Sequence, residues 1–234
     1  MIEPNMATML CYILTDAKLE ASLDSLLQSA VDVSFNSISV DGAESTSDTA
    51  VLVSSSKIPT PTSEFEVQLN QICKDLAADL VRNGEGTSHV IRITLSNFSS
   101  SRKDAVKLGR HIVNSPLFKC AVAGNDPNIG RLAGAVGSFL GTENANVDPG
   151  KITFTIGGKP IFKNGIFCID GDDTEQALSA HMKNAMFNEE ETFPSHQRFV
   201  EVGVDFGEGT GEEAIVLGSD LTQEYVTINA DYRS

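Results

Sequence analysis

The sequence predicts a mixed α/β fold with mostly antiparallel sheets and helices interleaved between the strands. Some segments place apolar residues in steps of three and four, others alternate apolar and polar residues, and the clearest strands cluster late in the chain. A chain of 234 residues, 41% of them hydrophobic, is long enough to bury a sizeable core. This length allows one large domain or two small ones.

Helical periodicity predicts four helices, over residues 19–31, 63–83, 102–114 and 174–187. The second has Ser63 at its start and Glu66 three residues later, which is the spacing of a capping box. A further helix, "LAGAVGSFL", follows the turn-like "GNDPNIGR", and its small residues permit close packing on a neighbour.

Alternation of apolar and polar residues predicts strands in "HVIRITL", "KITFTI" and "VEVGVDF". Another strand is expected over residues 50–54, followed by an exposed Ser- and Pro-rich loop, "SSSKIPTPTSEF". Towards the C-terminus a Gly-rich turn lies between strand-like runs, in "GEGTGEEAIVLGSD" and "EYVTINADYRS". This arrangement predicts a hairpin.

The acidic charge balance argues against two classes of partner. With 17 basic and 32 acidic residues, the formal net charge is −15, which would repel a phosphate backbone. The chain also has no polybasic segment for an anionic membrane, no secretory signal and no apolar run near the roughly 20 residues that span a bilayer. We therefore expect neither nucleic acid nor a membrane as a partner.

The usual catalytic and cofactor motifs are missing from the sequence. No histidine forms H-E-x-x-H or pairs with cysteine at ligand spacing, so no metal is expected. The runs "NGEGT" and "FGEGTGEE" lack G-K-[ST] and contain acidic residues, which favours turns over phosphate loops, and there is no G-x-S-x-G elbow. The cysteines stand singly and are expected to be small buried hydrophobes of a reducing compartment: Cys11, Cys73, Cys120 and Cys168.

Five blocks of sequence nevertheless resemble one known family, in the same order. They are "MIEPNMATML", "SFNSISVDGAESTSDTAVL", "NGEGTSHVIRI", "SPLFKCAVAGNDPNIGR" and "SDLTQEYVTINADYRS". Together they resemble ornithine acetyltransferase, also called bifunctional glutamate N-acetyltransferase, from residue 1 to residue 234. The resemblance implies an α/β fold of the N-terminal-nucleophile type that is completed by an α half.

Members of that family cut themselves at an Ala-Thr bond, which the resemblance places between Ala7 and Thr8. Residues 1–7 are then the remnant of the α-chain side and residues 8–234 the β chain. The resemblance makes Thr8 the nucleophile, and the residue type suits this role. A terminal α-amine with a pKa of about 7.7 to 8.0 can accept the hydroxyl proton near neutral pH, whereas the amide nitrogen of an internal threonine cannot.

The implied reaction is ping-pong acetyl transfer from N-acetylornithine to glutamate, without metal or other cofactor. Some family members also accept acetyl-CoA. The implied partner is the α chain, in an α2β2 heterotetramer of the bacterial cytoplasm, or of the mitochondrial matrix in a eukaryote. Matching the family's binding residues one by one gives Glu85 as the counter-charge to a substrate ammonium, with Asn229 and Ser234 from the terminal block.

The chain departs from the family in three places. Ile129 stands where the family has Trp, and "DGAESTSD" where it has "DGDTSTND". The family's α half, with its oxyanion hole and a substrate-binding lysine, is not part of this sequence. Because one oxyanion-hole donor accounts for a factor of about 100 to 1,000 in rate, we expect the chain alone to be nearly inert. An N-terminal-nucleophile amidohydrolase or peptidase, and an inactive unprocessed fragment, remain the alternatives.

Overall fold

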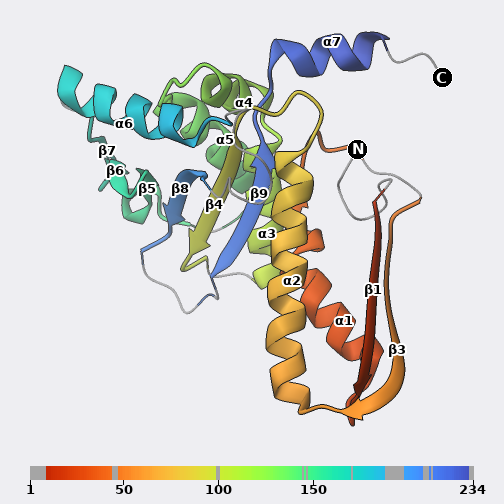
Figure 1. Cartoon of the computed structure of the whole chain (residues 1–234). Helices are drawn as coiled ribbons and strands as arrows, with labels where there is room; N and C mark the ends of the chain where they lie inside the picture. Colours follow the sequence, from red (N-terminus) through yellow and green to blue (C-terminus); the bar gives the residue numbers. More distant parts are fainter. Residues whose placement is uncertain are drawn as a thin grey trace. The chain divides into compact units, whose positions relative to one another are not determined.

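The computed structural model describes residues 9–43, 47–98, 101–143, 145, 147–169, 171–187, 198–207, 211 and 213–231. The chain divides into two compact units, Met1–Leu80 and Val81–Ser234 (Figure 1). None of the helices in this described part is long and apolar enough to cross a membrane.

The first unit is built around a pair of parallel strands. Strands β1 (Leu10–Lys18) and β3 (Thr49–Pro59) lie side by side in Figure 1, in register from Leu10 opposite Thr49 to Lys18 opposite Pro59. Parallel strands need a long crossover, and here the connection contains a helix. The connecting elements are α1 (Leu23–Asp32), η1 (Phe35–Ser37) and β2 (Ile38–Ser39).

Helices α1 and α2 (Thr62–Arg82) contribute buried apolar residues to the core of the first unit. These residues recur at helical spacing: Leu26, Ala30, Leu69, Cys73 and Ala77. The predicted loop over residues 54–65 is partly wrong, because β3 continues as far as Pro59. Pairing with β1 resumes after a bulge and extends the strand through the Ser-rich segment, which overrides its local preference for a loop.

A mixed sheet forms the centre of the second unit. Strand β4 (Val90–Ser96) runs parallel to β8 (Val200–Asp205) and antiparallel to β9 (Ala214–Ser219). Beyond β8 lie β5 (Thr153–Ile156), β6 (Lys159–Lys163) and β7 (Ile166–Phe167), each antiparallel to its neighbour. The predicted hairpin is wrong, because β4 lies between β8 and β9 and pairs with both.

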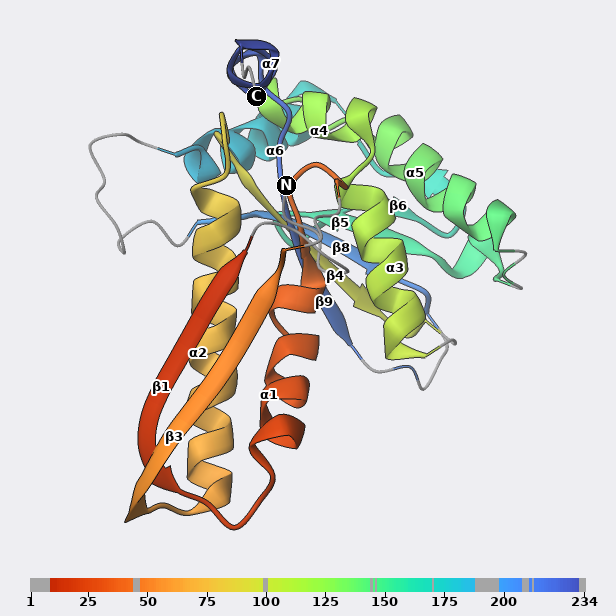
Figure 2. The ribbon, with the colours of Figure 1, turned by 90° about the vertical axis from the view of Figure 1, so that its right-hand side faces the viewer.

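Helices cover this sheet, and their apolar faces pack against its strands to form the core of the second unit. Helices α3 (Arg102–Val113), α4 (Pro116–Ala123) and α5 (Ile129–Thr142) lie on the same side of the sheet in Figure 2. The turn η2 (Pro149–Lys151) precedes β5, and α6 (Asp172–Ala185) lies beside β8. The inward faces meet in one apolar cluster that includes Ile91, Ile93, Leu95, Leu108, Ile112, Val136, Val202 and Val204.

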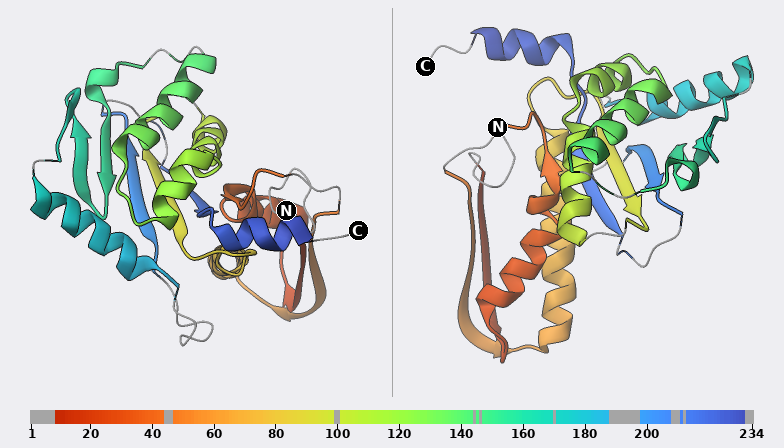
Figure 3. Two further views of the ribbon diagram at one scale, coloured as in Figure 1. Left: turned by 90° about the horizontal axis from the view of Figure 1, so that it is seen from above. Right: turned by 180° about the vertical axis from the view of Figure 1, so that it is seen from behind.

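The C-terminal block "EYVTINADYRS" is a helix in its described part and not a strand. Helix α7 (Gln223–Asp231) follows β9 and projects beyond the end of that strand (Figure 3). Thr222 precedes it, and its hydroxyl accepts the Tyr225 N–H at 3.2 Å, which is the hydrogen bond of an N-cap. The cap explains why a segment rich in strand-forming residues becomes helical here.

The cysteines agree only in part with the predicted burial. Cys11 and Cys73 are buried in the first unit, but Cys120 is exposed and Cys168 is half-buried; all four thiols are free. Cys120 lies on the outer side of α4, whose neighbours Phe118, Ala121 and Val122 point inward. Burial raises the pKa of Cys11, and burial together with the nearby Cys11 raises that of Cys73 to about 11.

Candidate functional site

Glu85 lies on an exposed turn between α2 and β4, directly before a glycine that the turn requires. Gly86 has φ +62°, and a Cβ there would overlap the backbone of Tyr225 at the start of α7. Only glycine allows both this left-handed conformation and this close approach. The turn that carries Glu85 is therefore fitted against the first turn of α7.

The Thr222 side chain joins the two segments. Its hydroxyl donates to the Gly86 carbonyl oxygen at 2.6 Å while it caps α7. One side chain thus fixes the Glu85 turn to the helix that carries Asn229. Asn229 itself is exposed, and its Nδ2 donates to the Tyr225 carbonyl oxygen of the same helix at 3.0 Å.

A buried polar network lies beneath these two segments and is centred on Asp220. Its Oδ1 accepts the Ser88 N–H at 3.0 Å, and its Oδ2 accepts from the Ser88 hydroxyl and from Nδ1 of His89 at 2.8 Å. Nε2 of His89 lies 3.2 Å from Oδ1 of Asn125. His89 and Asp220 are only 1% and 3% exposed, so the network is sheltered from solvent.

Lys119 connects α4 to the same place. Its buried Nζ donates to the Ser219 carbonyl oxygen at 2.6 Å, and the Leu221 N–H donates to the Lys119 carbonyl oxygen at 3.4 Å. Three sequence blocks, around Glu85, Asn125 and Asp220, therefore meet in one corner of the second unit. Buried polar groups that satisfy one another hold their segments in a single arrangement.

This network is not a Ser-His-Asp catalytic triad. In a triad the serine and the carboxylate contact opposite nitrogens of the imidazole. Here the Ser88 hydroxyl lies 3.0 Å from Nδ1 of His89, which is the nitrogen that also contacts Asp220. The geometry therefore supports a structural role for His89.

Three of the predicted site residues, Ala7, Thr8 and Ser234, lie outside the described residues. The residue after Thr8 is described and belongs to the first unit. Met9 donates its N–H to Oδ1 of Asp48 and accepts the Thr49 N–H at 2.8 Å. Sequence reasoning did not single out Asp48; its place in the "DGAESTSD" block was the available signal.

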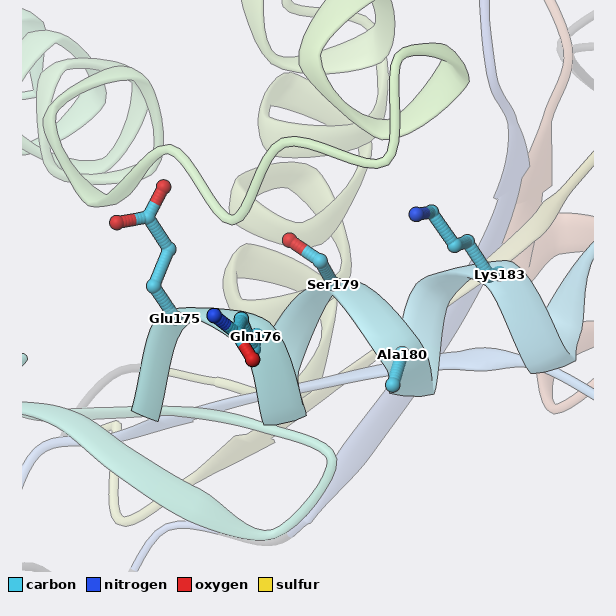
Figure 4. A pocket seen from close by; sticks show the side chains of 5 residues that line it. All are labelled: Glu175, Gln176, Ser179, Ala180 and Lys183. Carbon is cyan, nitrogen blue, oxygen red and sulfur yellow. The ribbon is translucent and has the colours of Figure 1, made fainter. Parts of the chain in front are cut away.

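The described residues also include a surface pocket and offer no obvious metal site. The pocket has a volume of about 460 Å³ and is lined by one face of α6, where Glu175, Ser179 and Lys183 point in the same direction (Figure 4). None of the predicted site residues lines it, and it opens widely to solvent. Among the described side chains, no group of three His, Cys, Asp or Glu is arranged to hold a metal ion.

The fold and this corner define a mixed α/β protein in which an exposed carboxylate turn and a C-terminal helix are held together on buried polar groups. The ArgJ family model matches residues 1–234. The chain therefore belongs to the ArgJ family, which confirms the family identified from the five sequence blocks.

Comparison with individual relatives also places the chain in the ArgJ family. The arginine biosynthesis bifunctional protein ArgJ of Rhodococcoides fascians is 37% identical over 234 residues, covering 99% of this chain and 53% of that protein. The protein of the same name from Bifidobacterium longum is 38% identical over 237 residues, covering 100% and 55%. The chain thus spans about half the length of the curated relatives it matches.

A solved structure agrees with the fold. The crystal structure of the arginine biosynthesis bifunctional protein argJ from Bacillus halodurans superimposes with a TM-score of 0.81 at 29% identity. The match covers 96% of this chain and 100% of that chain. The predicted mixed α/β class is confirmed by this match.

Proposed function

We propose that this chain is the β portion of a glutamate N-acetyltransferase of arginine biosynthesis. It transfers the acetyl group of N2-acetylornithine to glutamate and so yields ornithine and N-acetylglutamate. The observation that carries the proposal is the ArgJ family match over the whole of residues 1–234, together with the names of the relatives. Those relatives are bacterial, which favours the cytoplasm as the compartment.

The chemistry follows from a threonine at the start of a chain. Cleavage between Ala7 and Thr8 leaves residues 8–234 with a free α-amine, which takes the proton of the Thr8 hydroxyl as Oγ1 attacks the acetyl carbonyl carbon. The amide bond breaks, ornithine leaves with the proton on its amine, and the acetyl group stays on Thr8 as an ester. The amine of glutamate then attacks the ester and restores the hydroxyl.

We place substrate binding at Glu85, Asn229 and Ser234. Both substrates carry an ammonium group, for which the exposed Glu85 carboxylate is a suitable partner. The hydrogen bond from Thr222 to the Glu85 turn supports this assignment, because it keeps Glu85 and the helix of Asn229 in fixed relation. A fixed spacing lets a site recognise both charged ends of an amino acid.

The proposed partner is the α chain, which corresponds to the other half of the relatives. Leu10, Tyr12 and Leu14 alternate along β1 and are 59%, 65% and 76% exposed. Parallel strands occur almost only with both faces covered, yet this apolar face is open. We infer that the α chain covers this face, in an α2β2 assembly.

The decisive experiment is to co-express the chain with its α half and to assay acetyl transfer. Mass spectrometry should show a β chain that begins at Thr8, and the complex should form N-acetylglutamate from N2-acetylornithine and glutamate. Thr8→Ala should abolish both cleavage and transfer, since it removes the nucleophile. The control Thr142→Ala, at an exposed threonine of α5, should leave both intact. Release of free acetate without N-acetylglutamate would indicate an amidohydrolase instead.

The inferred docking face has its own test. Leu14→Asp places a charge on the most exposed residue of the apolar face and should prevent co-purification of the two chains. The matched control is Leu117→Asp on α4, which changes a leucine of the second unit that is 64% exposed. Retention of the α half by Leu14→Asp would show that this face is not the interface.

A further inference from the structure

Helix α7 depends on its first turn for its place in the second unit. None of its residues 223–231 is buried, and even its apolar side chains Val226 and Ile228 are exposed. A helix of nine residues is too short to be stable in water by its own hydrogen bonds. The contacts at the start of α7 therefore decide where the rest of the helix lies.

Those contacts join α7 to the turn that carries Glu85. The Thr222 hydroxyl donates to the Gly86 carbonyl oxygen at 2.6 Å and accepts the Tyr225 N–H at 3.2 Å. A Cβ at Gly86 would overlap the Tyr225 backbone, so the two segments are in direct contact. Thr222 is thus the side chain that both begins the helix and ties it to the residue after Glu85.

Asn229 is linked to the same contact through Tyr225. Its Nδ2 donates at 3.0 Å to the Tyr225 carbonyl oxygen, one turn or about 6 Å earlier in the helix. Tyr225 is also the residue whose backbone meets Gly86, next to Glu85. The Glu85 carboxylate and the Asn229 amide are both exposed, and they lie on the two sides of this contact.

We propose that Thr222 is a positioning residue for substrate binding, because its hydroxyl sets the distance between the Glu85 carboxylate and the Asn229 amide. The inference rests on the proposed function, in which these two side chains bind the substrates. Thr222 itself touches no substrate. Without its hydroxyl, α7 would have to be ordered each time a substrate binds to both side chains, and this ordering weakens binding.

The test compares Thr222→Val, Thr222→Ser and Thr227→Val in the co-expressed two-chain complex. Valine keeps the shape of threonine without the hydroxyl, whereas serine keeps the hydroxyl. Thr227 is the matched control, because its hydroxyl donates within α7, to the Gln223 carbonyl oxygen at 3.0 Å. Thr222→Val should raise KM for N2-acetylornithine and for glutamate about fivefold, with kcat unchanged within about twofold. Thr222→Ser and Thr227→Val should match the wild type.

A second comparison separates positioning from stability. Loss of folded protein alone would lower kcat per total protein and leave KM unchanged. If Thr222 acts by spacing Glu85 from Asn229, the spacing no longer matters once Glu85 cannot bind. Adding Thr222→Val to Glu85→Gln should therefore change KM by less than about twofold. The same fivefold rise in both backgrounds, or no rise in either, would overturn the inference.

Thr222→Gly covers the case in which the valine variant does not assemble. Glycine is well tolerated at an N-cap, but it cannot donate a side-chain hydrogen bond to the Gly86 carbonyl oxygen. The same rise in KM is expected, and an unchanged KM in Thr222→Gly would overturn the inference while the proposed function stands. A wild-type complex that transfers no acetyl group would overturn the proposed function and this inference with it.

Discussion

His181 shows how the burial of one side chain links this fold to pH. The ring is half-buried on α6, and its Nε2 accepts the Glu201 N–H of β8 at 3.1 Å. Gly157, with φ +56°, lies against the ring, and a Cβ there would come within 2.8 Å of Cγ. Burial lowers the pKa of His181, and the Glu201 carboxylate opposes this effect in part. The neutral ring is therefore the form that the fold accommodates.

We expect the second unit to lose stability as the pH falls from 7 to 5.5. The unfolded chain binds a proton at His181 near the ordinary pKa of about 6.5, whereas the folded chain binds it only at lower pH. The stability that His181 contributes is thus complete above about pH 6.5 and is lost as the pH falls towards the folded pKa. Calorimetric Tm values should fall less for His181→Gln, whose amide oxygen can still accept the Glu201 N–H. An equal fall in Tm for the wild type and for His181→Gln between pH 7 and pH 5.5 would contradict this expectation.

Single residues also show where sequence reasoning about the site ends. Glu85 and Asn229 were found because their blocks resemble a family. His89 and Asp220 are 131 residues apart in sequence, and Met9 and Asp48 are 39 apart. No local spacing records such pairs, since they are created by strand pairing. Resemblance to a family points to the residues proposed to bind substrate, whereas only the structure shows which residues hold their segments together.

At the scale of elements, the close approach of α3 to the sheet depends on Gly109. A Cβ at this position would overlap Cγ2 of Val216 on β9 and lie 2.9 Å from Cδ1 of Leu95 on β4. Helix and sheet can therefore pack closely only because this position lacks a side chain. Elsewhere, Gly134 of α5 is exposed, and a Cβ there would meet no atom within 4 Å.

The two glycines predict opposite effects of the same substitution. Gly109→Ala should destabilise the protein by about 1 to 3 kcal/mol, because overpacking forces α3 away from the sheet. Gly134→Ala should stabilise it by about 0.5 to 1 kcal/mol, because alanine is the better helix former. Denaturant unfolding of both variants measures the difference. A Gly109→Ala protein as stable as the wild type would show that α3 and β9 separate easily.

Many of the elements were predictable from periodicity, but β1, α4, β6 and β7 were not predicted, and neither was the strand pairing. The alternation of Ile91, Ile93 and Leu95 identifies β4, and helical spacing identifies α1, α2, α3 and α6. Periodicity reports which face of a strand is buried and not which strand lies next to it, so β4 between β8 and β9 was missed. The length of β3 depends on pairing with β1, which is a tertiary effect. The Thr222 cap of α7 is a local signal, but the strand-like composition of the segment outweighed it in the prediction.

For the whole molecule, the dominant physical feature is the net charge of −15. Like charges within a folded unit repel one another and oppose folding, and salt screens this repulsion. Arg92 and Glu201 form a partly exposed ion pair, and Cζ of Arg92 lies 4.5 Å from the centre of the Phe199 ring. Because the pair is partly exposed, it offsets little of the repulsion between the acidic groups.

The Tm should therefore rise when NaCl is increased from 10 to 150 mM. The screening length shortens from about 30 to about 8 Å over this range, so repulsion between distant acidic groups fades. Scanning fluorimetry at pH 7.5 measures the effect, and equal osmolality of sucrose controls for changes in water activity. A lower Tm in salt would mean that attractive pairs outweigh the net repulsion.

The parallel pairing of β1 and β3 also affects the order in which contacts form during folding. The two strands are separated by a long crossover that includes α1, so their pairing is a non-local contact and we expect it to form late in folding. Met9 acquires its hydrogen bonds to Asp48 and Thr49 at that moment and not before. The bond proposed for cleavage directly precedes Thr8, the neighbour of Met9. We therefore expect any cleavage that requires Met9 to be held in this way to follow completion of the first unit.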